Sequence, residues 1–141
     1  MEKFKILIVD DDAEDRGIIK DSMELIHAGD IIHFAENGEK ALEILEAQAQ
    51  ENHFPCLVVL DLNMPRLNGT ETLRRIKANP DLQKIPIVIY STSINPLEKE
   101  KCMLLGASDY ITKPLSFRDS QLTAQKLLGF CDSHLQVDNL Q

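Results

Sequence analysis

Two hydrophobic periodicities alternate along the chain. Five short apolar runs, rich in β-branched residues and bounded by polar or turn residues, predict β-strands. These runs lie at residues 6–9, 31–34, 57–60, 87–90 and 110–111. Between them, apolar residues recur at the three- and four-residue spacing of an amphipathic helix. The intervening segments predict helices over residues 12–27, 38–51, 69–78, 97–105 and 116–130.

The strict alternation of strands and helices predicts an α/β fold with a parallel sheet and right-handed crossovers. The runs at 6–9 and 57–60 are apolar throughout, as expected of strands that helices cover on both faces. Pro96, Gly106 and Ser116 are suited to helix ends. Residues 131–141 are mostly polar and are interpreted as a tail, so we expect one domain over residues 3–130 and no second domain.

Composition and charge narrow the possible partners. The chain has 141 residues and a formal net charge of −8, which disfavours direct nucleic-acid binding. The sequence has neither a signal-peptide pattern nor an apolar run long enough to cross a bilayer, so we expect no membrane association and a cytoplasmic location. The three cysteines lack metal-ligand spacing. Cys56 opens an apolar run, which predicts a buried thiol and fits a reducing compartment.

Polar residues with reactive groups follow four of the five predicted strands. In open parallel sheets, ligands bind beyond the carboxyl ends of the strands. The residues at these ends are Asp10 and Asp11, then Asp61, then Ser91 and Thr92, and finally Lys113. Any one of them alone is explained as well by helix capping or a turn. Capping does not explain Asp61, because a loop containing Pro65 follows it, and it does not explain a lysine at the same edge.

Together these residue types suit phosphoryl transfer. Carboxylates that converge at one edge repel one another, and a bound cation relieves that repulsion. An all-oxygen ligand set favours Mg²⁺. A carboxylate such as Asp61 can attack phosphorus to form an aspartyl phosphate. The ammonium of Lys113 and the hydroxyl of Ser91 would then contact the phosphoryl oxygens.

Four sequence blocks resemble the signature blocks of response regulator receiver domains, in particular the stand-alone, chemotaxis-regulator-like type. They are residues 9–12, 60–65, 86–92 and 109–114. The resemblance spans about residues 3–130, and Asp61 lies 30 residues before Ser91 and 52 before Lys113, as in the family. It implies a flavodoxin-like, doubly wound sheet of five strands in the order 2-1-3-4-5.

The resemblance also implies a role for each residue of the site. Asp61 is implied as the phosphoacceptor, and Lys113 as the phosphate-contacting lysine. The implied metal ligands are Asp10, Asp11, Asp61 and the backbone carbonyl of Asn63. Ser91 and Tyr110 are implied as a switch pair, in which the hydroxyl moves toward the phosphoryl group and the ring turns inward. Thr92 and Pro114 are implied as auxiliary residues, with a cis Lys113–Pro114 bond.

The implied partners are a sensor histidine kinase or phosphotransfer protein and a downstream protein target in trans. The target would recognise the face formed by the fourth helix, fifth strand and fifth helix. The chain is expected to be a monomer or weak homodimer. Modification of Asp61 would be Mg²⁺-dependent self-phosphorylation without steady-state turnover, so the chain is not expected to be an enzyme. The acidic run from Asp10 to Asp15 is interpreted partly as the site and partly as a solvated helix start, where negative charge suits the dipole.

Two alternatives remain open from the sequence. A phosphatase or phosphotransferase of the haloacid dehalogenase type also uses a strand-end aspartate, a serine, a lysine and paired acids around Mg²⁺. Such enzymes need a second aspartate two residues after the nucleophile, and Asn63 occupies that position. The second alternative is a phosphate-independent interaction module. A nucleotide-binding domain is disfavoured because no glycine-rich loop follows the first strand.

Overall fold

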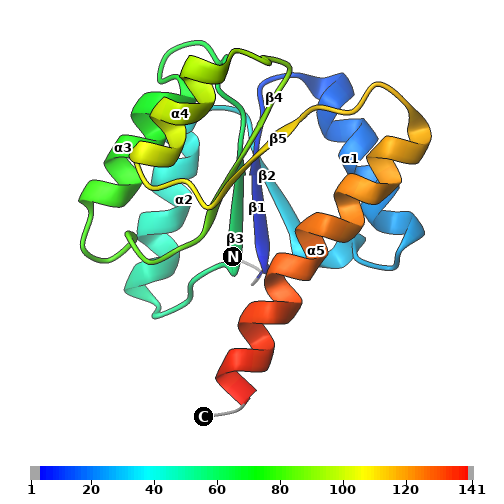
Figure 1. The fold of residues 1–141 in the computed structure, drawn as a ribbon. Coiled ribbons are helices and arrows are strands. Elements are labelled where there is room, and N and C mark those ends of the chain that lie inside the picture. Colours follow the sequence, from blue (N-terminus) through cyan, green and yellow to red (C-terminus); the bar gives the residue numbers. More distant parts are fainter. Residues whose placement is uncertain (1–3, 140–141) are drawn as a thin grey trace.

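Five parallel strands form one sheet with helices on both faces (Figure 1). The computed structural model describes residues 4–139, and residues 132–139 by their backbone only. The strands are β1 (Ile6–Val9), β2 (Ile32–Ala35), β3 (Leu57–Leu60), β4 (Ile87–Ser91) and β5 (Asp109–Thr112). The helices are α1 (Ala13–Leu25), a short 3-10 helix η1 (Gly29–Ile31), α2 (Gly38–Gln50), α3 (Gly69–Ala78), α4 (Pro96–Leu104) and α5 (Phe117–Asn139).

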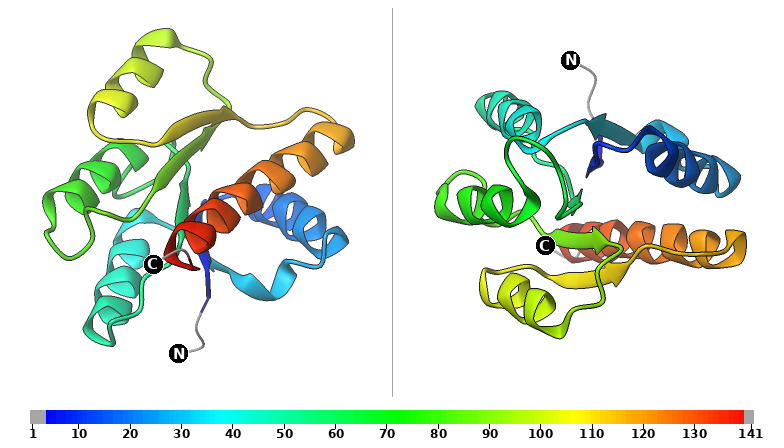
Figure 2. Two further views of the ribbon diagram at one scale, coloured as in Figure 1. Left: turned by 60° about the horizontal axis from the view of Figure 1, so that its bottom comes forward. Right: turned by 90° about the horizontal axis from the view of Figure 1, so that it is seen from above.

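The strand order is β2-β1-β3-β4-β5, and all four neighbouring pairs are parallel. This confirms the predicted doubly wound, flavodoxin-like fold. Helices α1 and α5 cover one face of the sheet, and α2, α3 and α4 cover the other (Figure 2). The reversal of strand order between β1 and β3 places the carboxyl ends of these two strands side by side, where ligands bind in such sheets.

Side chains alternate between the two faces and build two hydrophobic cores. Because successive residues of a strand point to opposite faces, Leu7 and Val9 pack under α2 and α3, whereas Ile6 and Ile8 pack under α1 and α5. The strands β1, β3 and β4 are buried throughout. These three strands form a rigid platform, from whose ends the polar residues project.

The predicted roles of Pro96, Gly106 and Ser116 at helix ends are confirmed. Pro96 occupies the first turn of α4, and Gly106 follows that helix with a φ of +108°, in the left-handed region that glycine adopts without strain. The Ser116 hydroxyl oxygen accepts from the backbone N–H of Asp119 at 3.1 Å and so caps α5. The end of α5 was predicted wrongly, because the helix continues to Asn139 rather than stopping at residue 130. The boundary between domain and tail stays a prediction.

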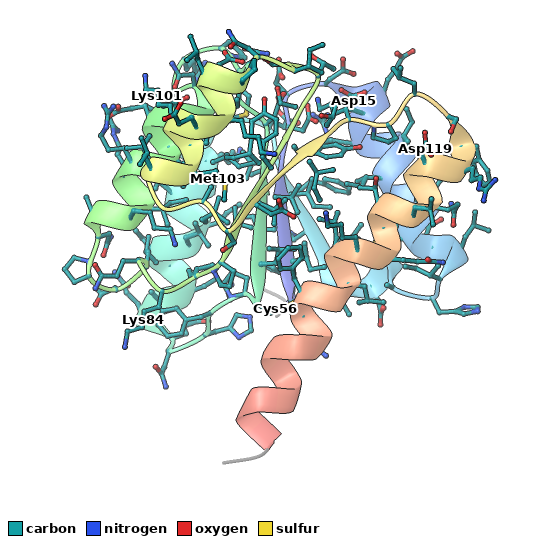
Figure 3. All side chains as sticks on the ribbon, in the orientation of Figure 1. Asp15, Cys56, Lys84, Lys101, Met103 and Asp119 are labelled. Atoms are coloured by element: carbon teal, nitrogen blue, oxygen red, sulfur yellow. A yellow bond between two sulfur atoms is a disulfide. The ribbon has the colours of Figure 1, made fainter. Side chains whose placement is uncertain are left out.

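The cysteines differ from the expectation in one respect. Cys56 is buried as predicted, but it forms a disulfide with Cys131, and the two Cα atoms lie 5.3 Å apart. The prediction of a free Cys56 thiol is therefore wrong, because Cys131 of helix α5 is bonded to Cys56 just before β3. Figure 3 shows Cys56 close to the ribbon of α5. Cys102 is a buried free thiol.

The peptide bond before Pro114 differs from the expectation. Between residues 4 and 139 the structure has no cis peptide bond, so the expected cis Lys113–Pro114 bond is wrong. A trans bond is the more stable isomer even before proline.

None of the described helices is long and apolar enough to cross a bilayer.

Candidate functional site

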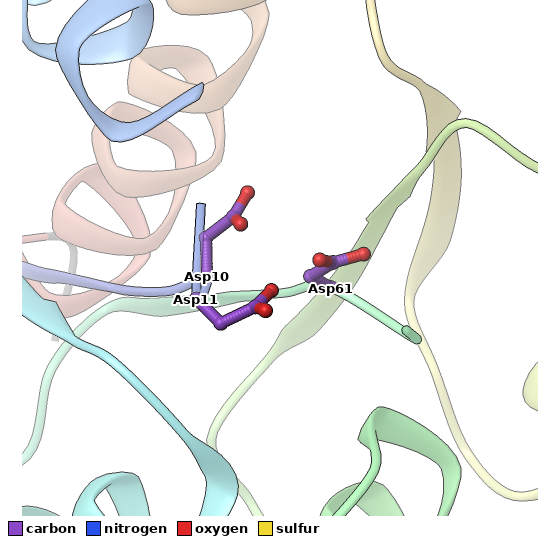
Figure 4. A group of neighbouring side chains, drawn as sticks. All are labelled: Asp10, Asp11 and Asp61. Carbon is purple, nitrogen blue, oxygen red and sulfur yellow. The ribbon is translucent and has the colours of Figure 1, made fainter. Parts of the chain in front are cut away.

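Three carboxylates converge at the carboxyl edge of the sheet (Figure 4). Asp10 and Asp11 follow β1, and Asp61 follows β3. One carboxylate oxygen from each of the three lies within 4.8 Å of the others. The pairing of β1 with β3 brings them together, since the Asp61 N–H donates to the Val9 carbonyl at 3.0 Å. Asp10 and Asp61 are buried, and Asp11 is exposed to solvent.

Local hydrogen bonds fix the two buried carboxylates. The backbone N–H of Asp12 donates to Asp10 Oδ1 at 3.0 Å, and that of Asn63 donates to Asp61 Oδ1 at 3.3 Å. The Arg16 guanidinium donates to the Asp10 carbonyl oxygen at 2.8 Å. The orientation of each carboxylate is thus set by the loop that follows its strand.

Gly69 permits the loop after Asp61 to fold back on the strand. Its N–H donates to the Leu62 carbonyl at 3.0 Å, at the start of α3. A Cβ added at Gly69 would lie 2.1 Å from the Asp61 carbonyl oxygen, far inside van der Waals contact. Only glycine allows this approach, and the helix start therefore holds the Asp61 backbone in place.

Lys113 lies among three carboxylates and an aromatic ring. Its Nζ is 2.7 Å from Asp15 Oδ2, 2.9 Å from Asp10 Oδ2 and 3.5 Å from Asp61 Oδ2. It also lies 5.6 Å from the centroid of the Tyr90 ring, within the range of a cation–π contact. Burial lowers the pKa of Lys113, but the hydrogen bonds to Asp15 and Asp10 outweigh that effect and hold the pKa above its ordinary value. The ammonium is therefore charged at neutral pH.

The pKa of the Asp61 carboxyl group lies above its ordinary value. Burial, together with the negative charge of Asp10, raises the pKa of Asp61 to about 6. The Lys113 ammonium opposes both effects without cancelling them. The folded chain thus disfavours the ionised carboxylate, and a cation or other positive group at this edge would stabilise it.

The remaining predicted residues lie on or just after β4 and β5, and not all of them contact the carboxylates. Ser91 ends β4, is fully buried, and accepts from the Ser93 N–H at 3.1 Å. The Tyr110 ring packs against the core under α4, and its hydroxyl donates to the Ser93 carbonyl at 2.9 Å. Thr92 is exposed. Pro114 is half-buried and lines a surface hollow beside Leu122 of α5.

The sequence profile of the response regulator receiver domain matches residues 6–125 of the chain. The chain belongs to this family. Receiver domains act in two-component phosphorelay signalling, and those of the chemotaxis-regulator type are generally not enzymes. The haloacid dehalogenase alternative is not favoured: both the family match and Asn63, in place of the required second aspartate, stand against it.

Similar receiver domains occur alone and within longer proteins. The chain is 31% identical over 129 residues to the chemotaxis protein CheY1 of Helicobacter pylori, which covers 92% of this chain and 100% of CheY1. It is 40% identical over 125 residues to a protein-glutamate methylesterase/protein-glutamine glutaminase of Treponema denticola. That match covers 87% of this chain but 32% of the methylesterase, so the chain corresponds to one part of the longer protein.

Solved structures of receiver domains share the fold. The phosphorylated cyanobacterial phytochrome response regulator RcpA superposes with a TM-score of 0.80 at 28% identity, covering 92% of this chain and 94% of RcpA. The Mn²⁺-bound form of response regulator Rcp1 gives a TM-score of 0.72 at 32% identity, covering 86% of this chain and 88% of Rcp1. The three clustered aspartates of this receiver domain fit a divalent cation by number, spacing and chemistry.

Sequence reasoning missed two residues of this receiver site. Asp15 was interpreted as part of a solvated helix start, whereas its side chain is 30% exposed and pairs with Lys113. Tyr90 was interpreted only as part of an apolar strand, whereas its ring flanks the lysine. The acidic run after β1 was the available signal for Asp15. It did not identify which carboxylate meets a lysine 98 residues away.

The stability of the receiver domain should depend on Asp61 in a pH-dependent way. Without divalent cations, Asp61→Asn is expected to raise the free energy of unfolding at about pH 8 by about 1–3 kcal/mol. The reason is that the pKa of Asp61 rises from 3.8 to about 6 on folding, so wild-type stability falls as the pH rises through that range. The gain should therefore disappear near pH 4, below the unfolded pKa. Urea unfolding of both proteins at the two pH values tests this, and a gain of equal size at both would contradict it.

Proposed function

We propose that Asp61 accepts a phosphoryl group from a phosphohistidine of a sensor histidine kinase or phosphotransfer protein. The observation that supports this most directly is the buried Asp61 carboxylate between two further aspartates and the Lys113 ammonium. An oxygen of Asp61 attacks phosphorus, the new O–P bond forms, and the P–N bond to the donor imidazole breaks. The electron pair of that bond leaves with the imidazole, which takes a proton from solvent.

Each neighbouring residue has a role in this transfer. Asp10 and Asp61 are held by backbone N–H groups, so the nucleophile is oriented before the donor arrives. Lys113 neutralises charge on the phosphoryl oxygens from the α1 side of the site. Ser91, at the end of β4, donates its hydroxyl to a further phosphoryl oxygen.

The cation that we propose is Mg²⁺, held by Asp10, Asp11, Asp61 and the carbonyl of Asn63. Hard oxygen ligands and an exposed face at Asp11 suit an ion that keeps several waters. The related Rcp1 has been solved in a Mn²⁺-bound form, which supports a divalent ion at this position. Bound there, the ion would neutralise the carboxylates and the developing phosphoryl charge.

The output of the modification is a change at the face of α4, β5 and α5. Ser91 moves toward the phosphoryl group, and Tyr110, already bonded to the Ser93 carbonyl, is held inward beside it. Exposed apolar residues on this face, including Leu97, Leu104 and Phe117, offer contact area to a downstream protein in trans. Thr92, at the mouth of the site, narrows access to Asp61.

The wider role follows from the same chemistry. We propose self-phosphorylation without steady-state turnover, because Asn63 supplies no acid to speed product release. The net charge of −8 argues against direct nucleic-acid contact, and the chain would act in the cytoplasm as a monomer or weak homodimer. In that compartment the Cys56–Cys131 pair would be exposed to reductants.

Cation-dependent labelling tests this function. With a small phosphodonor such as acetyl phosphate and Mg²⁺, intact mass spectrometry should detect one added phosphoryl group. Removal of divalent ions with a chelator should abolish the labelling, because the clustered carboxylates would then repel the incoming anion. Restoring Mg²⁺ should restore it. Labelling that is indifferent to the chelator would count against the proposed cation site.

A further inference from the structure

Asp15 is a carboxylate beside the site that does not belong to the cation cluster. It lies in the first turn of α1, at the top of the view in Figure 3, and its side chain is 30% exposed. The carboxylates that meet within 4.8 Å are those of Asp10, Asp11 and Asp61. Asp15 instead contacts Lys113, at 2.7 Å from Oδ2 to Nζ.

The distances around Lys113 rank its three carboxylate partners. The contact with Asp15 is the shortest, that with Asp10 is 2.9 Å, and that with Asp61 is 3.5 Å. A contact of 2.7 Å is a strong charge-assisted hydrogen bond, whereas 3.5 Å is too long for one. The lysine is thus directed toward α1 more than toward the phosphoacceptor.

The backbone on both sides of the pair is fixed. The Asp15 N–H donates to the side chain of the N-cap Asp12 at 3.3 Å, and the Lys113 N–H donates to the Ser91 carbonyl at 2.8 Å. The Lys113 ammonium can therefore change its hydrogen-bond partner by rotation of side chains alone, without movement of β5 or α1. A phosphoryl group on Asp61 would add oxygen acceptors at the carboxylate that lies farthest of the three from the ammonium.

We propose that Asp15 is a positioning residue that holds Lys113 away from the phosphoryl oxygens and so weakens the phosphorylated form. The inference rests on the proposed function of Asp61 as phosphoacceptor. An N–H of Lys113 that is bonded to Asp15 is not available to the phosphoryl group. Breaking that bond is part of the free energy of phosphorylation, and it is modest because water reaches the partly exposed Asp15 carboxylate.

The test measures the affinity of the chain for beryllofluoride, which mimics a phosphoryl group on a carboxylate, in the presence of Mg²⁺. Asp15→Asn is expected to bind the analogue about three- to tenfold more tightly than wild type. Titration calorimetry or fluorine NMR gives the dissociation constants. Glu14→Gln is the matched control, since it removes one negative charge from an exposed position in the same helical turn, and its affinity should stay near that of wild type.

A merely structural role of Asp15 would lower the free energy of unfolding and leave the affinity for the analogue unchanged or weaker. That result would overturn the inference, as would an equal gain in Glu14→Gln, which would assign the effect to net charge. Failure of the proposed function would give a different result. Wild type itself would then neither bind the analogue nor be labelled by a phosphodonor, and the inference about Asp15 would be overturned together with the proposed function. Wild-type binding with no gain in Asp15→Asn overturns the inference alone.

Discussion

Asp61→Asn is expected to lose phosphoryl labelling completely while keeping the fold. The amide nitrogen and oxygen of asparagine are poor nucleophiles toward phosphorus, and Asp10 and Asp11 would be engaged as ligands of the proposed cation. The asparagine side chain occupies the same space and can still accept from the Asn63 N–H. The measurement is intact mass spectrometry after incubation with acetyl phosphate and Mg²⁺.

Asp12→Asn is the matched control for that loss. It makes the same chemical change two residues from Asp10, on an exposed side chain that caps α1. Asparagine caps a helix about as well as aspartate, so the fold and the labelling of this variant should match wild type. Labelling of Asp61→Asn at the wild-type level would place the phosphoryl group on another residue.

The second large effect is expected from Lys113→Met. This change removes the positive charge that lies within 3.5 Å of Asp10, Asp15 and Asp61, while the methionine chain keeps much of the packing against Tyr90. Because one partner of a buried ion pair is lost, unfolding without Mg²⁺ should become easier by about 3–5 kcal/mol. Added Mg²⁺ should recover part of this loss, since the carboxylates remain to bind it.

Switching should fail in the same variant. With beryllofluoride and Mg²⁺, NMR signals of the Tyr110 ring should shift in wild type and stay unchanged in Lys113→Met, since the lysine no longer bridges the site to β5. Lys126→Met is the control, because Lys126 pairs with Asp109 at 3.1 Å on an exposed part of α5. A normal response of the Tyr110 signals in Lys113→Met would contradict the assigned role of the lysine.

The fold was predictable because hydrophobic periodicity is a strong local signal. Which side of each helix packs against the sheet was less predictable. In α1, the three- and four-residue spacing of apolar residues includes Ile18 and Leu25, yet these side chains are 46% and 59% exposed. Met23 is fully buried instead. The helix packs along the stripe that Ile19 and Met23 share, and the sequence pattern alone does not decide between two overlapping apolar stripes.

The site was predictable to the extent that strand ends determine it. Asp10, Asp61 and Lys113 each follow a strand, and in a parallel sheet all strand ends meet at one edge. The Asp15–Lys113 pair and the Cys56–Cys131 disulfide were not predictable, because each joins a helix to a distant strand end. Such contacts depend on the exact rotation and length of α1 and α5, which local sequence does not encode.

Direct location of the phosphoryl group tests the central claim. The chain is phosphorylated by a phosphohistidine donor with Mg²⁺, treated with borohydride to reduce the acyl phosphate, and digested for peptide sequencing by mass spectrometry. We predict that the reduced residue, homoserine in place of aspartate, is found at Asp61 alone. Homoserine at Asp10, Asp11 or Asp12, or a phosphoryl group that survives on a histidine or serine with Asp61 intact, would contradict the assignment of Asp61 as the phosphoacceptor.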